Sequence, residues 1–290
     1  MDFCGLIIKL QKIRKGEVVT LGHSCLGRDI YGVFYNFKSE QNLLISGAIH
    51  AREHITSDLI MWLIDCLEHS NTKARLNLPN IMFIPCVNPD GMELVNRGLD
   101  SVKNAKYTTK LEKMVQNCDF CDFKANICGV DLNNNFDAKF GTDPRYAIAP
   151  SAHGYNGVVP ESEPESKLLA ELARFLNPDF TISFHSKGEE IYYNFHLDSG
   201  RKKYHKKTAE YFSKLTGYKL VDDTGVSAGG FKDYCIEKLE IPSITIEVGS
   251  DDLAHPIPSD KLSTITPHFE GFYEAVNRAF LYIKKHKNKF

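Results

Sequence analysis

Short apolar runs alternate along this chain with longer stretches that have the residue spacing of helices. The apolar runs lie at 42–48, 80–87, 179–184 and 243–248, and the expected helices lie at 56–69, 163–176, 201–216 and 268–285. Strands that are buried on both faces are continuous hydrophobic runs, and strands that alternate with helices form largely parallel sheets. The sequence therefore predicts an α/β fold with helices on both faces of a sheet.

The remaining segments suggest one domain that spans residues 1–290. A short helix is expected at 7–14, and two strands at Val18–Ser24 and Asp29–Asn36 are joined by a turn at Leu26-Gly27. Residues 98–128 are polar and are expected to be an irregular insertion. A long irregular insertion in a compact domain more often has a function than not. The chain shows no internal repeat and no linker of low complexity.

Composition and charge exclude several classes of partner. The 290 residues are 42% hydrophobic and 25% charged, with a formal net charge of −2. This balance implies no general attraction to nucleic acid or to an anionic membrane, and the basic run Lys284–Lys287 is interpreted as a solvated helix end. The first residues place Lys and Arg after a short apolar stretch, the reverse of a signal peptide. We therefore expect a cytoplasmic protein without a membrane segment.

The eight cysteines lie mostly in apolar runs, which is typical of reduced, buried thiols. Cys118 and Cys121 have the spacing of a zinc knuckle or a redox pair, and only Cys128 lies near them in sequence. Free thiols are the favoured interpretation here. A metal or disulfide role for these three residues is the alternative.

Polar residues follow the apolar runs where each expected strand ends. Residues 49–54 follow the first run, Asn88–Gly91 the second and His185–Gly188 the third, while Glu247 lies within the last. In open α/β sheets, ligands bind beyond the carboxyl ends of the strands. The topology therefore predicts that these side chains meet at one edge of the sheet.

Three of these residues form a possible zinc site. His50 and Glu53 are three positions apart, so both can face one point, and His185 completes a His₂Glu set that leaves a position open for water. A single histidine in such a loop is more often a surface or capping residue. A glutamate in the apolar run Ser243–Val248 is harder to explain without a function, because a buried carboxylate needs a partner.

The order of the motifs resembles that of the M14 zinc carboxypeptidase family. The matching motifs are His50-x-x-Glu53, Asn88-Pro89-Asp90-Gly91, Gly129–Phe136, His185, Ser227–Gly230 and Ile246-Glu247. The resemblance extends from about residue 20 to 285. It implies a single domain with a mixed eight-stranded sheet between helices, one zinc ion per chain and a peptide substrate.

The resemblance also implies a role for each matched residue. His50, Glu53 and His185 would bind zinc. Glu247 would be the general base that takes a proton from the attacking water and returns one to the leaving amine. Arg52 would lie in the substrate cleft, and Asn133 would contact the terminal carboxylate of the substrate.

Three departures from the family pattern concern substrate recognition. Asn134 stands where family members that trim ordinary C-termini have an arginine clamp for the carboxylate. Lys124 stands where they have the arginine that stabilises the oxyanion, so Lys124 is expected to take this catalytic role. Gly225 and Val226 occupy the positions near which the family has a tyrosine lid.

The stretches 123–133, 185–190 and 241–249 are most similar to a subgroup, the γ-D-glutamyl-diaminopimelate peptidases that act on bacterial cell-wall peptides. The resemblance therefore implies a zinc metallopeptidase that acts near the C-terminus of a peptide, and the expected substrate is a cell-wall peptide such as a muropeptide. The alternatives are a conventional metallocarboxypeptidase, a catalytically impaired zinc protein that binds peptides, and a small-molecule deacylase on the same fold.

Overall fold

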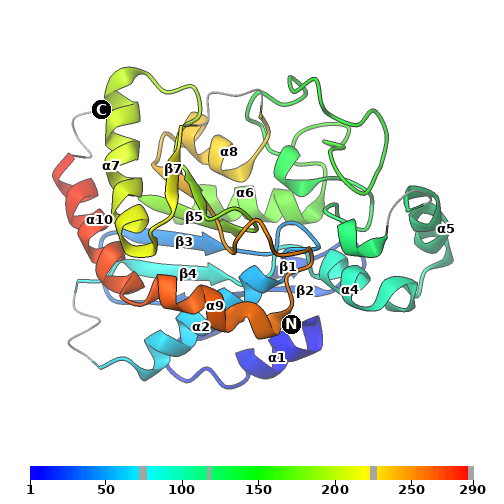
Figure 1. The fold of residues 1–290 in the computed structure, drawn as a ribbon, viewed down its shortest axis with the longest axis horizontal. Coiled ribbons are helices and arrows are strands. Elements are labelled where there is room, and N and C mark those ends of the chain that lie inside the picture. The colour runs from blue at the N-terminus through cyan, green and yellow to red at the C-terminus, as the bar shows by residue number, and fades with distance from the viewer. Residues whose placement is uncertain (72–76, 116–118, 223–226, 287–290) are drawn as a thin grey trace.

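One mixed sheet of eight strands crosses the molecule (Figure 1), in the order β1-β2-β4-β3-β5-β8-β6-β7. The computed structural model describes residues 1–71, 77–115, 119–222 and 227–286. The strands are β1 (Glu17–His23), β2 (Asp29–Tyr35), β3 (Asn42–Ser46), β4 (Asn80–Ile84), β5 (Phe180–His185), β6 (Glu190–Tyr192), β7 (Lys219–Val221) and β8 (Ser243–Glu247). The expected α/β fold with eight mixed strands is confirmed.

The four central strands run in the same direction. β3 pairs in parallel with β4 and with β5, and β5 pairs in parallel with β8. The antiparallel pairs are β1 with β2, β2 with β4, and β8 with β6. The carboxyl ends of β3, β4, β5 and β8 therefore meet at one edge of the sheet.

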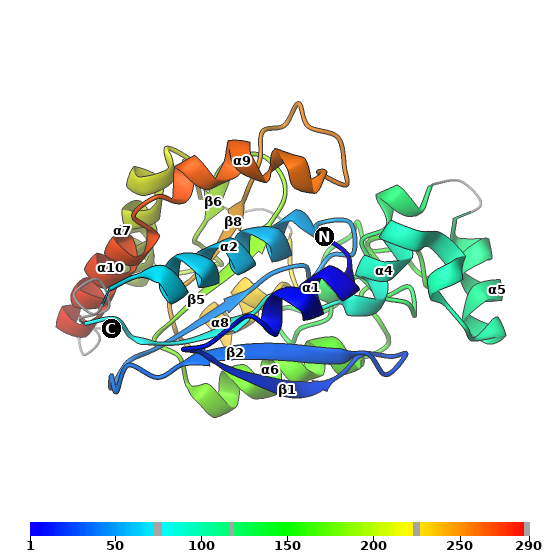
Figure 2. The ribbon, with the colours of Figure 1, turned by 90° about the horizontal axis from the view of Figure 1, so that it is seen from below.

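Helices cover both faces of the sheet (Figure 2). On one face, a core cluster includes residues of α1 (Phe3–Leu10), α2 (Ile55–His69), α7 (Ser199–Thr216) and α10 (Phe272–His286). On the other face, a second cluster includes residues of α6 (Pro164–Leu176) and α8 (Phe231–Glu237). Leu43 and Ile45 pack in the first cluster and Leu44 in the second, because successive strand side chains point to opposite faces.

A third cluster lies in a lobe beside the sheet, where α4 (Pro89–Arg97) and α5 (Ala105–Met114) stand to the right in Figure 1. Leu94, Leu111 and Phe123 are buried in this cluster. The remaining short elements are α9 (Leu262–Ile265), η1 (Gly98–Ser101), η2 (Phe120–Asp122), η3 (Leu132–Asn134), η4 (Ser259–Lys261) and η5 (Thr266–Phe269).

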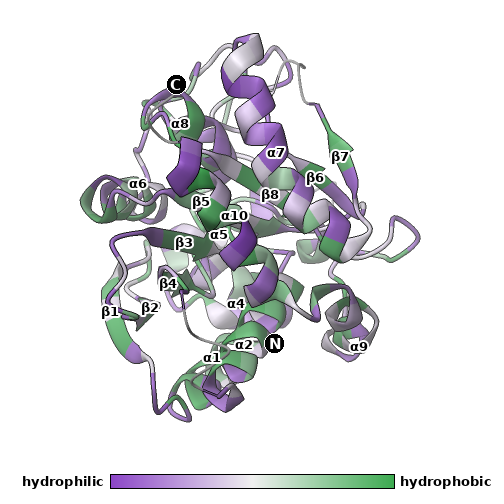
Figure 3. Cartoon of the chain, turned by 90° about the vertical axis from the view of Figure 1, so that its left-hand side faces the viewer, coloured by the Kyte–Doolittle hydropathy of each residue, from purple (hydrophilic) through white to green (hydrophobic). Residues whose placement is uncertain are grey.

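Hydrophobic residues gather on the inner elements, while the outer helix α7 is largely hydrophilic (Figure 3). Aromatic contacts fix the helices on the sheet: the ring centroids of Phe180 and Phe212 are 5.6 Å apart, and those of Phe184 and Phe269 are 5.7 Å apart. None of the helices in the described ranges has the length and apolar character to span a bilayer.

Two predicted elements differ from the structure. The first helix begins at Phe3 rather than at residue 7, because the Asp2 side chain accepts a hydrogen bond from Gly5 N and caps the helix earlier. The segment 98–128, expected to be irregular, contains α5, whose residue Leu111 packs into the third cluster. Tertiary packing of one apolar side chain thus stabilises a helix that the polar sequence obscured.

Candidate metal centre

His50 and Glu53 lie in a tight turn between β3 and α2. The turn directly precedes α2, which begins at Ile55. Glu53 N donates to the carbonyl of His50 at 3.2 Å, which closes the turn and directs both side chains to the same side. In such a turn, side chains three residues apart can face the same point, as they do in a helix.

Neighbouring segments hold the turn in place. Thr56 Oγ1 donates to the carbonyl of Glu53 at 2.7 Å and accepts from Ala48 N at 2.7 Å. From the other side, Ala51 N and Arg52 N donate to the carbonyls of Lys124 and Phe123, each at 3.0 Å. The backbone of the turn is therefore fixed by β3, by α2 and by the loop at 123–124.

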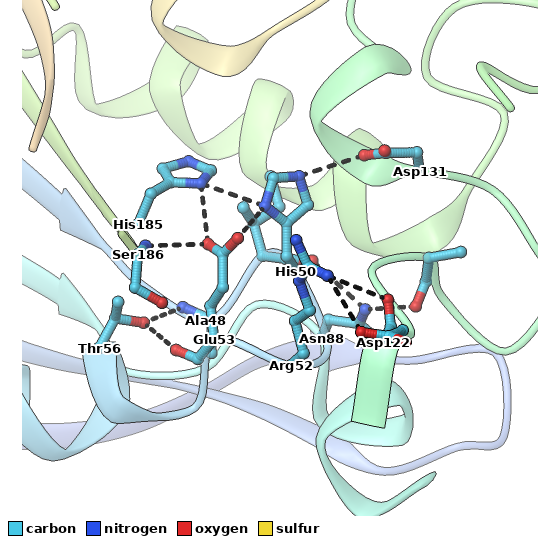
Figure 4. A network of polar contacts seen from close by, with 12 residues as sticks. Ala48, His50, Arg52, Glu53, Thr56, Asn88, Asp122, Asp131, His185 and Ser186 are labelled. Carbon is cyan, nitrogen blue, oxygen red and sulfur yellow. Dashed lines mark hydrogen bonds and ion pairs between the residues drawn. The ribbon is translucent and has the colours of Figure 1, made fainter. Parts of the chain in front are cut away.

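The side chains of His50, Glu53 and His185 converge on one point (Figure 4). His50 Nδ1 lies 2.8 Å from Glu53 Oε1, and His185 Nδ1 lies 3.1 Å from Glu53 Oε2. The two Nδ1 atoms are 3.2 Å apart. Ser186 N donates to Glu53 Oε2 at 3.3 Å and helps to orient the carboxylate. The structure thus brings together the three residues that the sequence predicted as metal ligands.

This donor set fits a zinc ion. Ligands about 2.0–2.1 Å from a tetrahedral zinc ion lie about 3.3 Å from one another, close to the separations found here. Two imidazole nitrogens and one carboxylate are also a recognised catalytic donor set for zinc. All three residues are buried, so few water molecules compete for the donors.

Asp131 fixes the ring of His50. Its Oδ1 lies 3.2 Å from His50 Nε2, and its Oδ2 accepts a hydrogen bond from Gly154 N at 3.0 Å. A carboxylate at Nε2 favours the tautomer that leaves Nδ1 unprotonated and directed at the metal position. The geometry therefore supports a role for Asp131 in orienting His50.

The electrostatics of the centre favour a bound cation. Burial opposes protonation of His50, yet the carboxylates of Glu53 and Asp131 raise its pKa to about 9. Burial likewise opposes ionisation of Glu53, yet His50 and His185 hold the pKa of this carboxyl well below its usual value. A positive charge between these groups is therefore stabilised, and a divalent cation would provide it.

Glu247 ends β8 directly beside His185, one of the three predicted metal ligands. The two residues are register partners on the parallel strands β5 and β8. Burial and the nearby charge of Glu53 raise the pKa of Glu247 to about 8, and its Oε2 has no hydrogen-bond partner among the described residues. A half-buried carboxylate with a free oxygen next to a metal position is suited to exchange protons with a bound water.

Lys124 and His255 also lie at the centre. The backbone of Lys124 adjoins the turn, because its carbonyl accepts a hydrogen bond from Ala51 N at 3.0 Å. The positive charge of Lys124 acts to lower the pKa of both His185 and Glu247, although less than other groups shift them. Burial and the charge of Arg52 lower the pKa of His255 to about 4, so its ring is neutral at physiological pH. The family resemblance predicted a catalytic role for Lys124, and this role stays a prediction.

Arg52 extends from the turn toward the rim of the site. Its Nη1 lies 3.7 Å from Asp122 Oδ1, and in Figure 4 its side chain points toward Asp122 and away from His185. Its Nε is buried and has no hydrogen-bond partner in the described parts of the chain. The arginine is thus placed beside the ligands with one donor available, and its contact with substrate stays a prediction.

Asn133 and Asn134 form a turn that packs against the glycines at 229–230. Asn133 Oδ1 accepts a hydrogen bond from Phe231 N at 3.1 Å. Gly229 has φ +76°, and a Cβ there would lie 2.5 Å from the carbonyl oxygen of Asn134. Only glycine fits this contact. Both asparagine side chains are half-buried, and their contact with substrate stays a prediction. Gly225 and Val226 lie outside the described residues.

The Asn88–Gly91 motif has a structural role. Asn88 Oδ1 accepts from Gly91 N at 2.9 Å and caps α4, while Asn88 Nδ2 donates to the carbonyls of Ile49 and Ala125 at 3.3 and 3.1 Å. Asp90 pairs with Arg28 and accepts from Leu26 N. The motif therefore connects the loops around the metal centre and supplies none of its ligands.

The profile of the zinc carboxypeptidase family, Peptidase M14, matches residues 11–271. The chain belongs to the zinc carboxypeptidase family. The family implies zinc, and its members are hydrolases of the peptidase class, so the predicted family and enzyme class are confirmed.

Two relatives illustrate the range of this family. The chain is 30% identical over 268 residues to the gamma-D-glutamyl-L-diamino acid endopeptidase 1 of Lysinibacillus sphaericus, a match that covers 88% of this chain and 65% of that protein. It is 27% identical over 175 residues to carboxypeptidase B2 of Bos taurus, which covers 58% of this chain and 38% of that protein. The chain therefore spans about two thirds of the length of the first relative and less than half of the length of the second.

Solved structures of zinc carboxypeptidases share the fold. Bovine thrombin-activatable fibrinolysis inhibitor superposes with a TM-score of 0.72 at 20% identity, over 98% of this chain and 95% of that one. A murein-tripeptide amidase from Escherichia coli O157 superposes with a TM-score of 0.55 at 24% identity, over 92% and 91%.

The sequence did not predict one cluster that the structure shows. Cys128 lies against Cys25, with 3.4 Å between the sulfur atoms, rather than against Cys121. Cys118 lies outside the described residues. The two cysteines are 103 positions apart in the sequence, and no sequence motif predicts a contact between residues at such a separation.

Proposed function

We propose that this protein is a zinc-dependent peptidase that hydrolyses an amide bond near the C-terminus of a peptide. The observation that carries the proposal is the convergence of His50, Glu53 and His185 on one point, with Glu247 in register beside His185. Three buried donors and one free carboxylate match the needs of hydrolysis, namely a metal position and a base that can reach the attacking water.

Each residue has a distinct task in this proposal. His50, Glu53 and His185 would hold one zinc ion, which when bound supplies Lewis acidity at the scissile carbonyl and lowers the pKa of water. Glu247 accepts a proton from the attacking water and returns a proton to the nitrogen of the leaving amine. Lys124 places its positive charge where negative charge develops on the carbonyl oxygen.

The proposed substrate is a cell-wall peptide of the γ-D-glutamyl-diamino acid type, or a muropeptide that contains it. The name of the Lysinibacillus relative supports this class. The residues support it as well, because Asn134 is neutral and cannot form the bidentate ion pair by which an arginine clamps a terminal carboxylate. We propose that Asn133, Asn134 and Arg52 instead contact the polar groups of the peptide.

The direct test compares two substrates with the full chain loaded with zinc. A γ-D-glutamyl-diamino acid peptide and an ordinary C-terminal peptide are incubated side by side, and the products are identified by mass. Cleavage of the γ-D-glutamyl bond supports the proposal. Release of single C-terminal residues from the ordinary peptide alone would assign the protein as a conventional carboxypeptidase, and binding without cleavage of either would favour a peptide-binding protein.

A further inference from the structure

We propose that Cys25, Cys128 and Glu163 form a second metal site for a thiophilic divalent cation such as Zn²⁺. One ligand atom from each of the three residues lies within 4.8 Å of the other two. The site is separate from the His50 centre, shares no ligand with it and does not depend on the proposed peptidase function. Thiolates with a carboxylate are donors that zinc accepts.

The three residues come from three different segments. Cys25 lies in the turn between β1 and β2, Cys128 lies in the loop before η3, and Glu163 immediately precedes α6. Cys25 Sγ is 3.4 Å from Cys128 Sγ and 3.9 Å from Glu163 Oε2. At a zinc–sulfur distance of about 2.3 Å, two tetrahedral thiolates lie about 3.8 Å apart, so small side-chain shifts complete the geometry.

Neighbouring polar groups already orient the donors. Asn126 Nδ2 donates to Glu163 Oε2 at 2.8 Å and to Glu165 Oε2 at 3.2 Å, while Asn126 Oδ1 accepts from Cys128 N at 3.0 Å. Glu165 Oε1 accepts from Cys25 N at 3.0 Å. Hydrogen bonds of this kind position metal ligands before the metal arrives. Glu165 Oε2 also lies 3.7 Å from Cys25 Sγ and is a possible fourth ligand.

Carboxylates lie close to the sulfur atoms. Glu163 Oε2 and Glu165 Oε2 lie 3.9 and 3.7 Å from Cys25 Sγ. A divalent cation between these groups would stabilise the thiolates and neutralise the carboxylates together. Both cysteines and Glu163 are half-buried, so an ion can reach them.

A bound ion would connect the β1–β2 turn, the loop after residue 123 and the start of α6. That loop carries Lys124 and Asp131, which lie four residues before Cys128 and three residues after it. The second site would therefore fix the segment that presents both residues to the His50 centre.

Cobalt titration of the metal-stripped, reduced full chain tests the site. Thiolate ligands give Co²⁺ a charge-transfer band in the near ultraviolet, whereas the His50 centre has no sulfur ligand. We expect two Co²⁺ ions per chain and a band that belongs to one of them. Cys25→Ser and Cys128→Ser should each lose the band and one equivalent, while Glu53→Gln should lose the other equivalent and keep the band.

Two further variants keep the test decisive. Glu163→Gln should weaken the affinity of the sulfur-containing site for Co²⁺ by about 10-fold or more. This variant keeps both thiols, so it tests the site even if a serine variant does not fold. Cys121→Ser, which alters another half-buried cysteine of the same lobe, should change nothing. A single equivalent without a near-ultraviolet band overturns the proposal. So does loss of two titratable thiols to a disulfide in the presence of Zn²⁺.

Discussion

His185 and Glu247 are register partners at the carboxyl ends of the neighbouring parallel strands β5 and β8. Side chains of register partners point to the same face of a sheet, and adjacent strands are about 4.8 Å apart. The proposed metal ligand and the proposed base are therefore separated by one strand spacing. The rigid centre of the sheet sets this distance, and no mobile loop has to close to establish it.

Asp131→Asn should weaken zinc binding. The variant keeps the size of the side chain but removes the carboxylate 3.2 Å from His50 Nε2, so the tautomer that directs Nδ1 at the metal is less favoured. We expect zinc affinity to fall by about 10–100-fold, measured by competition with a chromophoric chelator. Activity at saturating zinc should recover in large part. Unchanged affinity would show that Asp131 does not orient His50.

Lys124→Gln should lower turnover more than substrate binding. The variant keeps an extended side chain but removes the positive charge beside Glu247 and the proposed oxyanion position. Loss of one such group reduces kcat by about 10²–10³-fold, with KM and zinc content close to those of the wild type. Lys124→Arg should recover part of the loss. A Gln variant with full kcat would remove Lys124 from the catalytic residues.

His205 should make the protein less stable in acid. Burial, together with the charges of Arg201 and Lys232, lowers the pKa of His205 to about 3 from its ordinary value of 6.5. Between these values the unfolded chain binds a proton that the folded chain does not, so the free energy of unfolding falls as the pH decreases from 6.5 toward 3. His205→Gln removes this titration and should reduce that fall by on the order of a few kcal/mol.

Chemical denaturation at a series of pH values measures this effect. The exposed residue His69, whose side chain is 77% accessible, provides a matched control, because His69→Gln should keep the acid dependence of the wild type. Identical pH profiles for His205→Gln and wild type would show that His205 is protonated in the folded chain.

The four central strands β3, β4, β5 and β8 were predictable because their apolar runs are short, continuous and bounded by polar residues. The expected strand Asp29–Asn36 and the observed Asp29–Tyr35 differ by one residue. The short helix α4 was not predicted, because its sequence starts with Pro89 and includes Gly91, and its first turn depends on the cap from Asn88. Strand β6, with three residues, is too short to show a period.

The convergence of His50, Glu53 and His185 was predictable because the topology of the sheet brings the strand ends together. The residues around these three side chains were harder to predict. The effect of the Arg52 charge on the pKa of His255 depends on the path of the loop after β8, for which the sequence has no periodic signal. The contact between Cys25 and Cys128 likewise depends on how the lobe with α5 packs beside the sheet, and this packing is a property of the tertiary structure alone.

The variant Glu247→Gln tests the central claim most directly, on any peptide that the wild type cleaves. Glutamine has the same shape and leaves His50, Glu53 and His185 unchanged, so zinc content and melting temperature should equal those of the wild type. Turnover should fall by about 10²–10⁴-fold, because the amide cannot accept the proton of the attacking water. Glu53→Gln, as the comparison, should lose zinc together with turnover. A zinc-loaded Glu247→Gln protein with wild-type turnover would contradict the account.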